Sequence, residues 1–489
     1  MATDDRTWKP SRRNLLLNGA AGLVSLYCDL ETATPSRVST SAARRAQADS
    51  PFEPFRADLP IPPVLRPSRR TATTDQYVVT MRTAQVEILP GYSTPVLSYN
   101  GMLPGPTIHA RAGRRVEVLQ RNTLGVETNV HLHGARAPAS SDGHPRDGIP
   151  AGTRRVYTYP NRQAPATLWY HDHTHHATAE MVYRGLAAFY LLRDGREDEL
   201  GLPQGRYDIP LMIADKSFNA DGSLRYARDL NNGFLGDTVL VNGAVQPRLR
   251  VERRRYRLRF LNASNGRDYS LELSDGSPLT QVASDGGLLP RPSRVRRIML
   301  SSAERAEVVI DFSLYRPGTE LVLRNGLGTA GTSSVMRFDV VRGGSEDFRP
   351  LPRALREFKR LERPVATRQV VLDRQIIPRV EWQLNGLGFD MDRIDTRPRL
   401  GSTEVWRFVN RSTHTHPMHL HGFFFRVLAR GAKRPGASER GWKDTVRVDP
   451  GETVTIMPYF DGYPGAYVYH CHKLEHGDQN MMAQMEVTA

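Results

Sequence analysis

Cysteine is scarce in this chain of 489 residues, which contains only Cys28 and Cys471. Cys28 lies in a predicted targeting segment, so the processed chain keeps Cys471 alone and cannot form an intramolecular disulfide framework. Fifteen histidines accompany that single cysteine. A lone cysteine among many histidines is typical of a metal ligand or a nucleophile rather than of a structural thiol.

Lysine is also scarce, because only six of the 67 basic residues are lysines and the rest are arginines. With 52 acidic residues, the formal net charge is +15. Such a surface could bind nucleic acid or anionic cell-wall polymers. The arginines are scattered and no recognisable nucleic-acid module accompanies them, so we favour a solvated, arginine-rich surface and expect no nucleic-acid partner.

Long apolar runs are missing, and we therefore expect no membrane span. The nearest candidate runs from Leu15 to about Tyr27, which is too short for a stable span and fits the apolar part of an export signal. Arg12-Arg13 stands just before it, as in twin-arginine signals. We predict a targeting segment over residues 1–48, with Ala46-Gln47-Ala48 as a candidate cleavage site, and an exported, periplasmic or extracellular protein.

What the chain does have is alternation of apolar and polar residues, which predicts antiparallel β-sheets with one buried face. Three similar segments end in Asn122, Asn262 and Asn410, which are 140 and 148 residues apart. Each segment reads as a strand that enters a turn. Similarity at this domain-sized spacing predicts three duplicated β-domains rather than a solenoid.

The outer two repeats carry histidine pairs at matched positions. A His-x-His pair begins nine residues after the final asparagine of each: His131 and His133 in the first, His419 and His421 in the third. The middle repeat has Leu271 and Leu273 at these offsets, and leucine cannot bind a metal. Each outer repeat has a second pair further on: His171 and His173, then His470 and His472.

Residues i and i+2 of a strand point to one face, so each pair offers two imidazoles to the same side. An interface between the first and third domains would gather eight imidazoles, too many for one ion, and this predicts a metal cluster. Any single pair is better explained as ordinary surface or core histidines. Four pairs at repeat-matched positions argue against that alternative.

A second site is predicted around Cys471. Its candidate ligands are His416, His476 and Met481, and a thiolate, two imidazoles and a weak thioether form a blue-copper electron-transfer set. Zinc fits less well, because structural zinc sites favour several cysteines and catalytic sites keep an open position. Core filling is the alternative for Met481. Because Cys471 lies between two cluster histidines, electrons would have a short covalent path between the sites.

These motifs resemble those of the multicopper oxidases, a family that includes laccases, bilirubin oxidases and spore-coat laccases. The resemblance covers nearly the whole chain from about residue 70. It rests on four motifs: His131-Leu-His133-Gly134, Trp169-Tyr-His171-Asp-His173, His416-Pro-Met-His419-Leu-His421, and His470-Cys-His472 through His476 to Met481. It implies an all-β fold of three cupredoxin-like Greek-key sandwich or barrel domains, over residues 70–196, 207–345 and 371–489.

The resemblance also implies four copper ions per chain and no further cofactor. The single type 1 copper would be held by His416, Cys471, His476 and Met481. A trinuclear cluster between domains 1 and 3 would hold a type 2 copper on His131 and His419. Its type 3 pair would be held by His133, His171, His173, His421, His470 and His472. Five histidines are expected to be non-ligands: His109, His144, His175, His176 and His414. Of these, His175 and His176 are candidates for hydrogen bonds near the cluster.

Reduction of dioxygen to water consumes protons, so acids near the cluster matter. Asp142 matches such an acid in the bilirubin oxidase and spore-coat laccase branch, and Asp478 is a second candidate. Gly477 is a departure, because bacterial relatives often carry a glutamate at this position. Glu475 or Asp478 would then substitute for it, and solvated loop charges are the alternative explanation of both.

The expected activity is laccase-like: one-electron oxidation of phenols or aromatic amines, coupled to four-electron reduction of dioxygen, in a monomer. Cuprous oxidase and bilirubin oxidase are alternatives. The cuprous variant is less favoured, because the 13 methionines are dispersed except for Met481, Met482 and Met485. A non-catalytic cell-division or interaction protein of this fold would be expected to lack the ligands. A copper nitrite reductase would be expected to use fewer of them.

The sequence predicts four coppers per chain, because twelve residues match the family's ligand positions. Metal analysis of protein that has been loaded anaerobically with copper measures this number. One or two coppers at full occupancy would contradict the predicted cluster.

Overall fold

The computed structural model describes residues 53–343, 350–376 and 381–489, so the predicted targeting segment over residues 1–48 lies outside the described residues. Strands dominate these residues, and the longest helix among them, α2 (Thr178–Arg184), has seven residues. The all-β class predicted from the alternating pattern is confirmed. Within the described part of the chain, no helix has the length and apolarity that crossing a bilayer requires.

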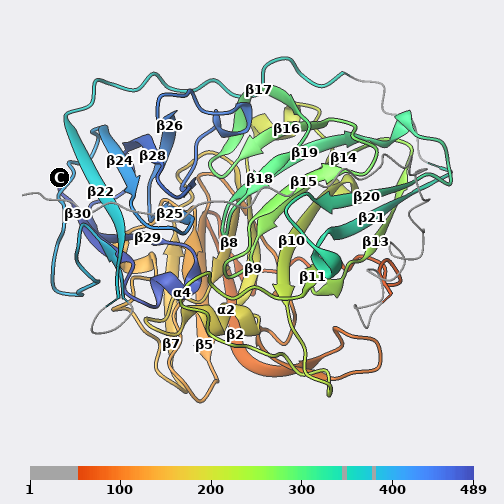
Figure 1. The fold of residues 1–489 in the computed structure, drawn as a ribbon, viewed down its shortest axis with the longest axis horizontal. Coiled ribbons are helices and arrows are strands. Elements are labelled where there is room, and N and C mark those ends of the chain that lie inside the picture. The colour runs from red at the N-terminus through yellow and green to blue at the C-terminus, as the bar shows by residue number, and fades with distance from the viewer. Residues whose placement is uncertain (1–52, 344–349, 377–380) are drawn as a thin grey trace, which may run out of the picture. The chain divides into compact units, whose positions relative to one another are not determined.

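The first sandwich consists of β1 to β9, coloured orange to yellow in Figure 1. One sheet has the order β1-β2-β5-β7 with β3 beside β2, and the other has the order β4-β9-β8-β6. Val79 and Val118 from one sheet share a core with Leu168 and Tyr190 from the other. The strands are β1 (Arg69–Arg70), β2 (Thr74–Val86), β3 (Thr94–Tyr99), β4 (Ile108–Arg111), β5 (Arg115–Asn122), β6 (His131–His133), β7 (Arg154–Tyr159), β8 (Ala166–His171) and β9 (Ala187–Arg193).

The second sandwich, green in Figure 1, pairs a seven-stranded sheet, β12-β11-β10-β14-β19-β16-β17, with a five-stranded sheet, β13-β21-β20-β15-β18. Leu258, Leu271 and Phe338 belong to its shared core. The strands are β10 (Asp208–Lys216), β11 (Thr238–Val241), β12 (Ala244–Val245), β13 (Arg248–Glu252), β14 (Arg255–Asn262), β15 (Tyr269–Leu273), β16 (Leu279–Ser284), β17 (Gly287–Val295), β18 (Ile298–Leu300), β19 (Arg305–Asp311), β20 (Glu320–Asn325) and β21 (Ser334–Val341).

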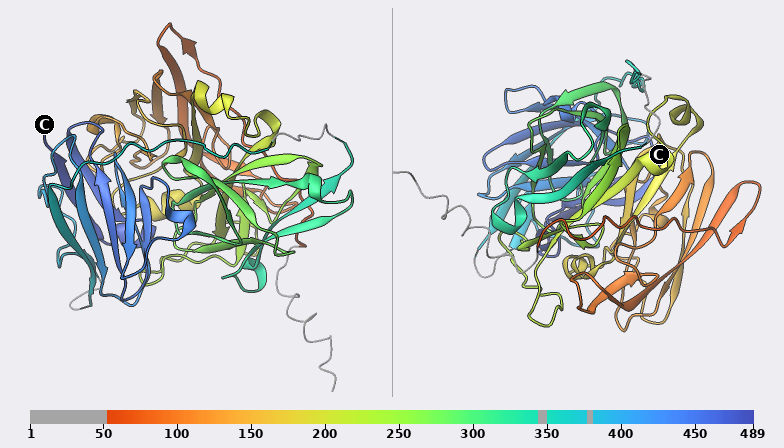
Figure 2. Two further views of the ribbon diagram at one scale, coloured as in Figure 1. Left: turned by 90° about the horizontal axis from the view of Figure 1, so that it is seen from above. Right: turned by 90° about the vertical axis from the view of Figure 1, so that its right-hand side faces the viewer.

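The third sandwich, blue in Figure 1, pairs the sheet β23-β22-β24-β28-β26 with the sheet β27-β25-β29-β30. Trp406, Leu420 and Tyr469 belong to its core. The orange, green and blue strands form separate blocks in the left view of Figure 2. The strands are β22 (Ala366–Gln375), β23 (Glu381–Leu384), β24 (Glu404–Asn410), β25 (His416–Leu420), β26 (Phe424–Arg430), β27 (Thr445–Val448), β28 (Thr453–Tyr459), β29 (Gly465–Cys471) and β30 (Met482–Val487).

The three segments that end in asparagine are equivalent strands. β5, β14 and β24 each pair in parallel with the first long strand of their sandwich and antiparallel with a later one. Each ends at its asparagine: Asn122, Asn262 and Asn410. In all three, the side-chain amide donates to backbone carbonyls of the following turn and of a distant segment. The Oδ1 atom of each asparagine accepts the backbone N–H of the residue two positions later. The same asparagine-stabilised turn therefore occurs in all three sandwiches.

Leu271 and Leu273, which stand where the outer repeats have histidines, lie on β15 and are buried in the core of the second sandwich. The second sandwich therefore fills this position with apolar packing. Its contribution to the site comes instead from loops and from the surfaces that it buries against the other two sandwiches.

A buried ionic network joins the first and second sandwiches. The Arg259 guanidinium donates to Asp208 at 2.6 and 2.8 Å, to Glu307 at 2.8 Å and to the hydroxyl of Thr167 on β8 at 3.0 Å. Burial by itself raises the pKa of Asp208, but Arg259 and its neighbouring arginines hold that pKa at about 2. These carboxylates are therefore charged inside the protein, and they depend on the guanidinium.

We expect Arg259→Met to destabilise the protein by about 3–5 kcal/mol, because it leaves buried carboxylates without their partner. Unfolding in urea, followed by intrinsic fluorescence, measures the change. Arg324→Met is the matched control: Arg324 is exposed on β20, and its loss should change stability by at most about 0.5 kcal/mol. Equal midpoints for the two variants would refute the role of the network.

Candidate metal centres

The predicted histidine pairs lie at the ends of paired strands. β6 and β8 run antiparallel in the first sandwich and place His131 directly opposite His171. β25 and β29 do the same in the third sandwich, with His419 opposite His470. Because the second histidine of each pair follows two residues later, each strand end presents two imidazoles to one side.

The eight imidazoles meet in three groups of three, and within each group the ligand atoms lie within 4.8 Å of one another. The groups are His131, His133 and His419; His133, His171 and His472; and His173, His421 and His470. Every group therefore combines residues of the first and third sandwiches. All eight side chains are buried, so the first and third sandwiches together enclose the cluster.

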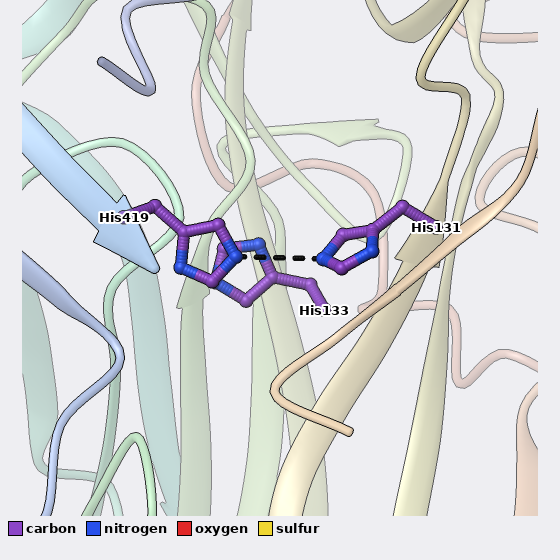
Figure 3. Close-up of side chains that lie close together, drawn as sticks. All are labelled: His131, His133 and His419. Atoms are coloured by element: carbon purple, nitrogen blue, oxygen red, sulfur yellow. Dashed lines mark hydrogen bonds between the residues drawn. The ribbon is translucent and has the colours of Figure 1, made fainter. Parts of the chain in front are cut away.

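Figure 3 shows how the two sandwiches meet in the first group. The Nε2 atoms of His131 and His419 face each other across 3.4 Å, and the ring of His133 stacks against that of His419 at 3.7 Å. In another group, Nε2 of His470 lies 3.2 Å from that of His173 and 3.0 Å from that of His421. Nitrogen atoms this close cannot all carry hydrogens, so several direct lone pairs at a common point.

Several of these imidazoles donate a hydrogen bond away from the cluster. Nδ1 donates to a backbone carbonyl in four of them: His131 to Asp142 at 2.6 Å, His171 to Asp172 at 2.8 Å, His419 to Asp444 at 2.8 Å, and His470 to Cys471 at 3.0 Å. A carbonyl only accepts, so Nδ1 carries the hydrogen and Nε2 keeps its lone pair for a metal.

In one of the three groups, each histidine has a buried nitrogen atom without a hydrogen-bond partner among the described residues. These atoms are His133 Nδ1, His171 Nε2 and His472 Nε2. An unpaired buried acceptor costs roughly 1–3 kcal/mol, and three of them facing one point favour a shared cation. These atoms therefore fit a metal ion, and His133 would bind it through Nδ1, since its Nε2 contacts the carboxylate of Asp444 at 3.0 Å.

Burial keeps the cluster imidazoles neutral. It lowers the pKa of His171 to about 3 and that of His470 to about 4. The pKa of His419 is also lowered to about 3, mainly by burial, although the Asp444 carboxylate opposes the change. Neutral imidazole is the form that binds metals, so the site does not need to lose protons when it loads.

Cys471 lies in a second, smaller group. Its Sγ atom is 3.5 Å from Nδ1 of His416 and 3.6 Å from Nδ1 of His476, and those two nitrogen atoms are 3.2 Å apart. The outer Nε2 atoms are occupied by the hydroxyl of Ser412 at 2.8 Å and the carbonyl of Asn231 at 2.9 Å. Burial raises the pKa of the Cys471 thiol to about 12, so a bound cation is what would make it a thiolate.

Met481 is buried in the same core as Cys471, and its carbonyl accepts the N–H of Cys471 at 3.0 Å. The backbone therefore brings Met481 beside the group of one cysteine and two histidines. Met482 pairs with His470 across β29 and β30. The role of Met481 as axial ligand stays a prediction.

Asp142 bridges histidines of the two outer sandwiches. Its carbonyl accepts from His131, and its Oδ2 atom lies 2.8 Å from Nδ1 of His421. The residue is fully buried, and burial raises the pKa of its carboxyl group well above the usual range. Its Oδ1 atom has no hydrogen-bond partner among the described residues. Asp142 can therefore orient His421 and hold a proton next to the cluster.

Glu475 and Asp478 are buried, which contradicts the alternative that they are solvated loop charges. The Asp478 carboxylate accepts the backbone N–H groups of Thr178 and Ala179 at the start of α2, and burial raises its pKa to about 8. Glu475 accepts from the hydroxyl of Tyr226 at 3.0 Å and from the amide of Asn265 at 2.8 Å. Both acids therefore connect the C-terminal segment to the first two sandwiches.

Gly477 lies beside His470, the histidine that precedes Cys471. A Cβ atom added at Gly477 would be 3.3 Å from the carbonyl of Cys471 and 3.9 Å from Nδ1 of His470. Gly477 lines a cavity together with His175, His176 and Asp478.

The five histidines predicted to be non-ligands belong to none of the groups of potential ligands found among the described residues. His176 donates to the carbonyl of Asp478 at 2.8 Å, and its ring lies against that of His175. His144 contacts Gln484 at 2.8 Å. Their rings therefore serve packing and hydrogen bonding around the site.

Asp444 is a functional candidate that the sequence reasoning missed. Its carbonyl accepts from His419, its carboxylate contacts His133, and Arg305 donates to it at 2.7 Å. Asp444 directly precedes β27, which pairs with β25 and so brings this acid beside His419, a candidate ligand. The distance in sequence between Asp444 and the histidines does not predict this contact, because the contact arises from the pairing and packing of strands that are far apart in the chain.

Comparison with known proteins decides the family. Family models described as multicopper oxidase match residues 80–197 and 363–489. A laccase of Bacillus stratosphericus is 38% identical over 513 aligned residues, which cover 89% of this chain and 99% of that protein. A bilirubin oxidase of Albifimbria verrucaria is 35% identical, over 96% of this chain and 88% of that protein. The chain belongs to the multicopper oxidase family.

Solved structures of multicopper oxidases share the fold. A laccase of Pediococcus acidilactici superposes with a TM-score of 0.82 at 35% identity, over 90% of this chain and 97% of that one. The McoA multicopper oxidase of Aquifex aeolicus superposes with a TM-score of 0.81 at 31% identity, over 90% of this chain and 100% of that one. The resemblance found in the sequence is confirmed, and this protein is a laccase-like, copper-dependent oxidoreductase that uses dioxygen.

We expect Asp142→Ala to weaken copper binding in this multicopper oxidase by about 10- to 100-fold, because the hydrogen bond that orients His421 is lost. Asp142→Asn keeps an acceptor oxygen at the same place and should retain most of the affinity. Competition with a chelator of known affinity, read as copper bound per chain, measures both. Equal affinities of the alanine variant and the unaltered protein would disprove the orienting role.

Proposed function

We propose that this multicopper oxidase binds four copper ions and couples one-electron oxidation of phenolic or aromatic amine donors to the reduction of dioxygen to water. His416, Cys471, His476 and Met481 would hold the type 1 ion. His131 and His419 would hold the type 2 ion. The type 3 pair would be held by His133, His171, His173, His421, His470 and His472.

The position of Cys471 carries this proposal. Its thiol faces two imidazoles, while the histidines on either side of it in the chain reach two groups of the eight-imidazole cluster. Copper supplies the one-electron acceptor at the cysteine and the dioxygen-reducing centre at the cluster. Cys471 joins them through its own backbone and that of one neighbour, and the carbonyl of Cys471 also accepts the Nδ1 hydrogen of His470.

The chain's own acids would manage the protons. Four donors each release one electron, and dioxygen takes up these four electrons with four protons to give two molecules of water. Asp142 contacts His421, and burial raises the pKa of its carboxyl group, which favours a proton there. Asp478 is the second candidate. Burial raises its pKa to about 8, so it can exchange a proton near neutral pH.

The organic donor is the finer part of the proposal. Laccases and a bilirubin oxidase among the relatives support aromatic donors. Bilirubin and Cu(I) are the alternatives, and dioxygen uptake with each donor ranks them. A cuprous oxidase would be expected to use methionine thioethers to bind Cu(I). The sequence around Asn231, whose carbonyl covers His476, is poor in methionine and gives no support to that alternative.

We further propose three cupredoxin domains over residues 70–196, 207–345 and 371–489. The first residues of β22 (Ala366–Gln375) lie before the start of the third range. We propose a monomer that is exported through a twin-arginine signal over residues 1–48. The paired arginines before a short apolar run support export, and the enclosure of all cluster ligands within one chain supports a monomer.

Cys471→Ser is expected to abolish the intense blue absorption and the oxidation of phenols, and to leave the three cluster coppers bound. The hydroxyl of serine is a poor ligand for a soft site, whereas the cluster histidines are untouched. Visible absorption, metal content and turnover of a phenolic dye measure the three effects. Unchanged dye turnover by the variant would refute the role of Cys471 in accepting electrons.

A further inference from the structure

Neither imidazole beside Cys471 offers an edge to a donor molecule. His416 and His476 are fully buried, and their outer Nε2 atoms are occupied by the Ser412 hydroxyl and the Asn231 carbonyl. A donor that arrives from solvent therefore cannot form a hydrogen bond with either ring while this cover is in place. Electrons must cross the residues that cover them.

Trp382 on β23 is the aromatic part of this cover. Its ring stacks on His476 at 4.1 Å and meets His416 edge-on at 4.9 Å, so it touches both imidazoles. Its indole N–H donates to the carbonyl of Leu230 at 2.8 Å, which ties it to the loop of the second sandwich that also supplies Asn231. Trp382 is itself buried, so a donor would rest on whatever covers the indole.

Arg374 on β22 provides that outer surface. It lies directly opposite Trp382 in the antiparallel pair of β22 and β23, and its guanidinium sits 5.1 Å from the centre of the Trp382 ring. The guanidinium also donates to the side chain of Asn231, which is exposed. Among the described residues, Arg374 has no acidic partner, and its buried Nε atom has no hydrogen-bond partner.

The positive charge of Arg374 is not neutralised by the nearby acid Asp229. The carboxylate of Asp229, two residues before Asn231 in the chain, is already occupied by N–H groups of its own turn. A negatively charged group would thus be attracted to the guanidinium of Arg374.

We propose that aromatic donors carrying a negative charge dock on Arg374 and the exposed side chain of Asn231, and that their electrons reach the Cys471 site through the ring of Trp382. This proposal rests on the function proposed above and names its donor class. A phenolic donor gives up one electron through Trp382 and its hydroxyl proton to water. Four such donors and one dioxygen yield four phenoxyl radicals and two molecules of water.

The planar guanidinium can both pair with a carboxylate and lie against an aromatic ring, which a neutral side chain cannot do. The test therefore compares a charged donor with a neutral one of the same ring: a dimethoxyphenol with a ring carboxylate, and its methyl ester. For Arg374→Gln, we expect kcat/KM for the carboxylate to fall about fivefold relative to kcat/KM for the ester, as for a half-exposed ion pair.

Two further variants serve as controls. Arg374→Lys keeps the charge and should retain most of the preference for the carboxylate, more at low salt than at high salt. Arg324→Gln removes an exposed arginine on β20 of the second sandwich and should change nothing. Binding of trimethoxybenzoate, which lacks the phenolic hydroxyl, to the oxidised copper-loaded enzyme should weaken in Arg374→Gln when it is measured by calorimetry. If Arg374→Gln leaves unchanged both the binding constant of trimethoxybenzoate and the ratio of kcat/KM for the carboxylate to kcat/KM for the ester, the proposed docking site is wrong.

The route through Trp382 has its own measurement. Bleaching of the blue absorption by donor without dioxygen follows electron transfer into the Cys471 site alone. Trp382→Leu should slow bleaching by both donors, and Trp382→Phe, which keeps a ring against His476, should slow it less. The midpoint potential of the blue site is measured in each variant, so that rates are compared at a known driving force. Equal bleaching rates in the leucine variant and the unaltered enzyme would rule out the Trp382 route.

Failure of the docking site and failure of the proposed function give different results. If the protein is not an oxidase of aromatic donors, the unaltered enzyme will oxidise neither the carboxylate nor the ester. If only the docking site is wrong, the unaltered enzyme will oxidise both donors and Arg374→Gln will do so with the same preference.

Discussion

The structure depends on one electrostatic requirement, which is that eight neutral imidazoles share a buried space between two sandwiches. Desolvation keeps them uncharged, and in four of them a backbone carbonyl on the far side of the ring fixes which nitrogen atom carries the hydrogen. Lone pairs that converge in this way repel one another and lack partners. A cation relieves this repulsion, so the interface of the first and third sandwiches gains its full stability only with metal present.

The other charged groups of the site can be understood from this requirement. Asp142 and Asp444 each approach two histidines, using a carbonyl for one and a carboxylate for the other. Arg305 donates to the carboxylate of Asp444, so the charge of Asp444 is compensated inside the protein. The second sandwich supplies that arginine on β19. A sandwich without candidate ligands thus holds the acid that contacts His133 and His419.

Much of the site could be predicted from the sequence because local rules determine it. Strand alternation requires that His131 and His133 share a face, and repeat spacing relates them to His419 and His421. The three repeated segments proved to end in the same asparagine-stabilised turn, at Asn122, Asn262 and Asn410. Asp444, Asn231 and Trp382 could not be found in this way, because their contacts with ligands depend on the pairing and packing of segments far apart in the chain. The burial of Glu475 and Asp478 could not be predicted for the same reason. Glu475 lies in the short helix Leu474–Gly477 and Asp478 directly follows it, and the partners of both acids lie in other sandwiches.

The carbonyl of Asn231 closes over His476 from a sandwich that binds no metal. Substitution of the exposed Asn231 side chain would leave this backbone carbonyl in place, so the outer face of the loop can change while the hydrogen bond to His476 is kept. One residue therefore presents a fixed backbone face to the interior and a replaceable side chain to solvent.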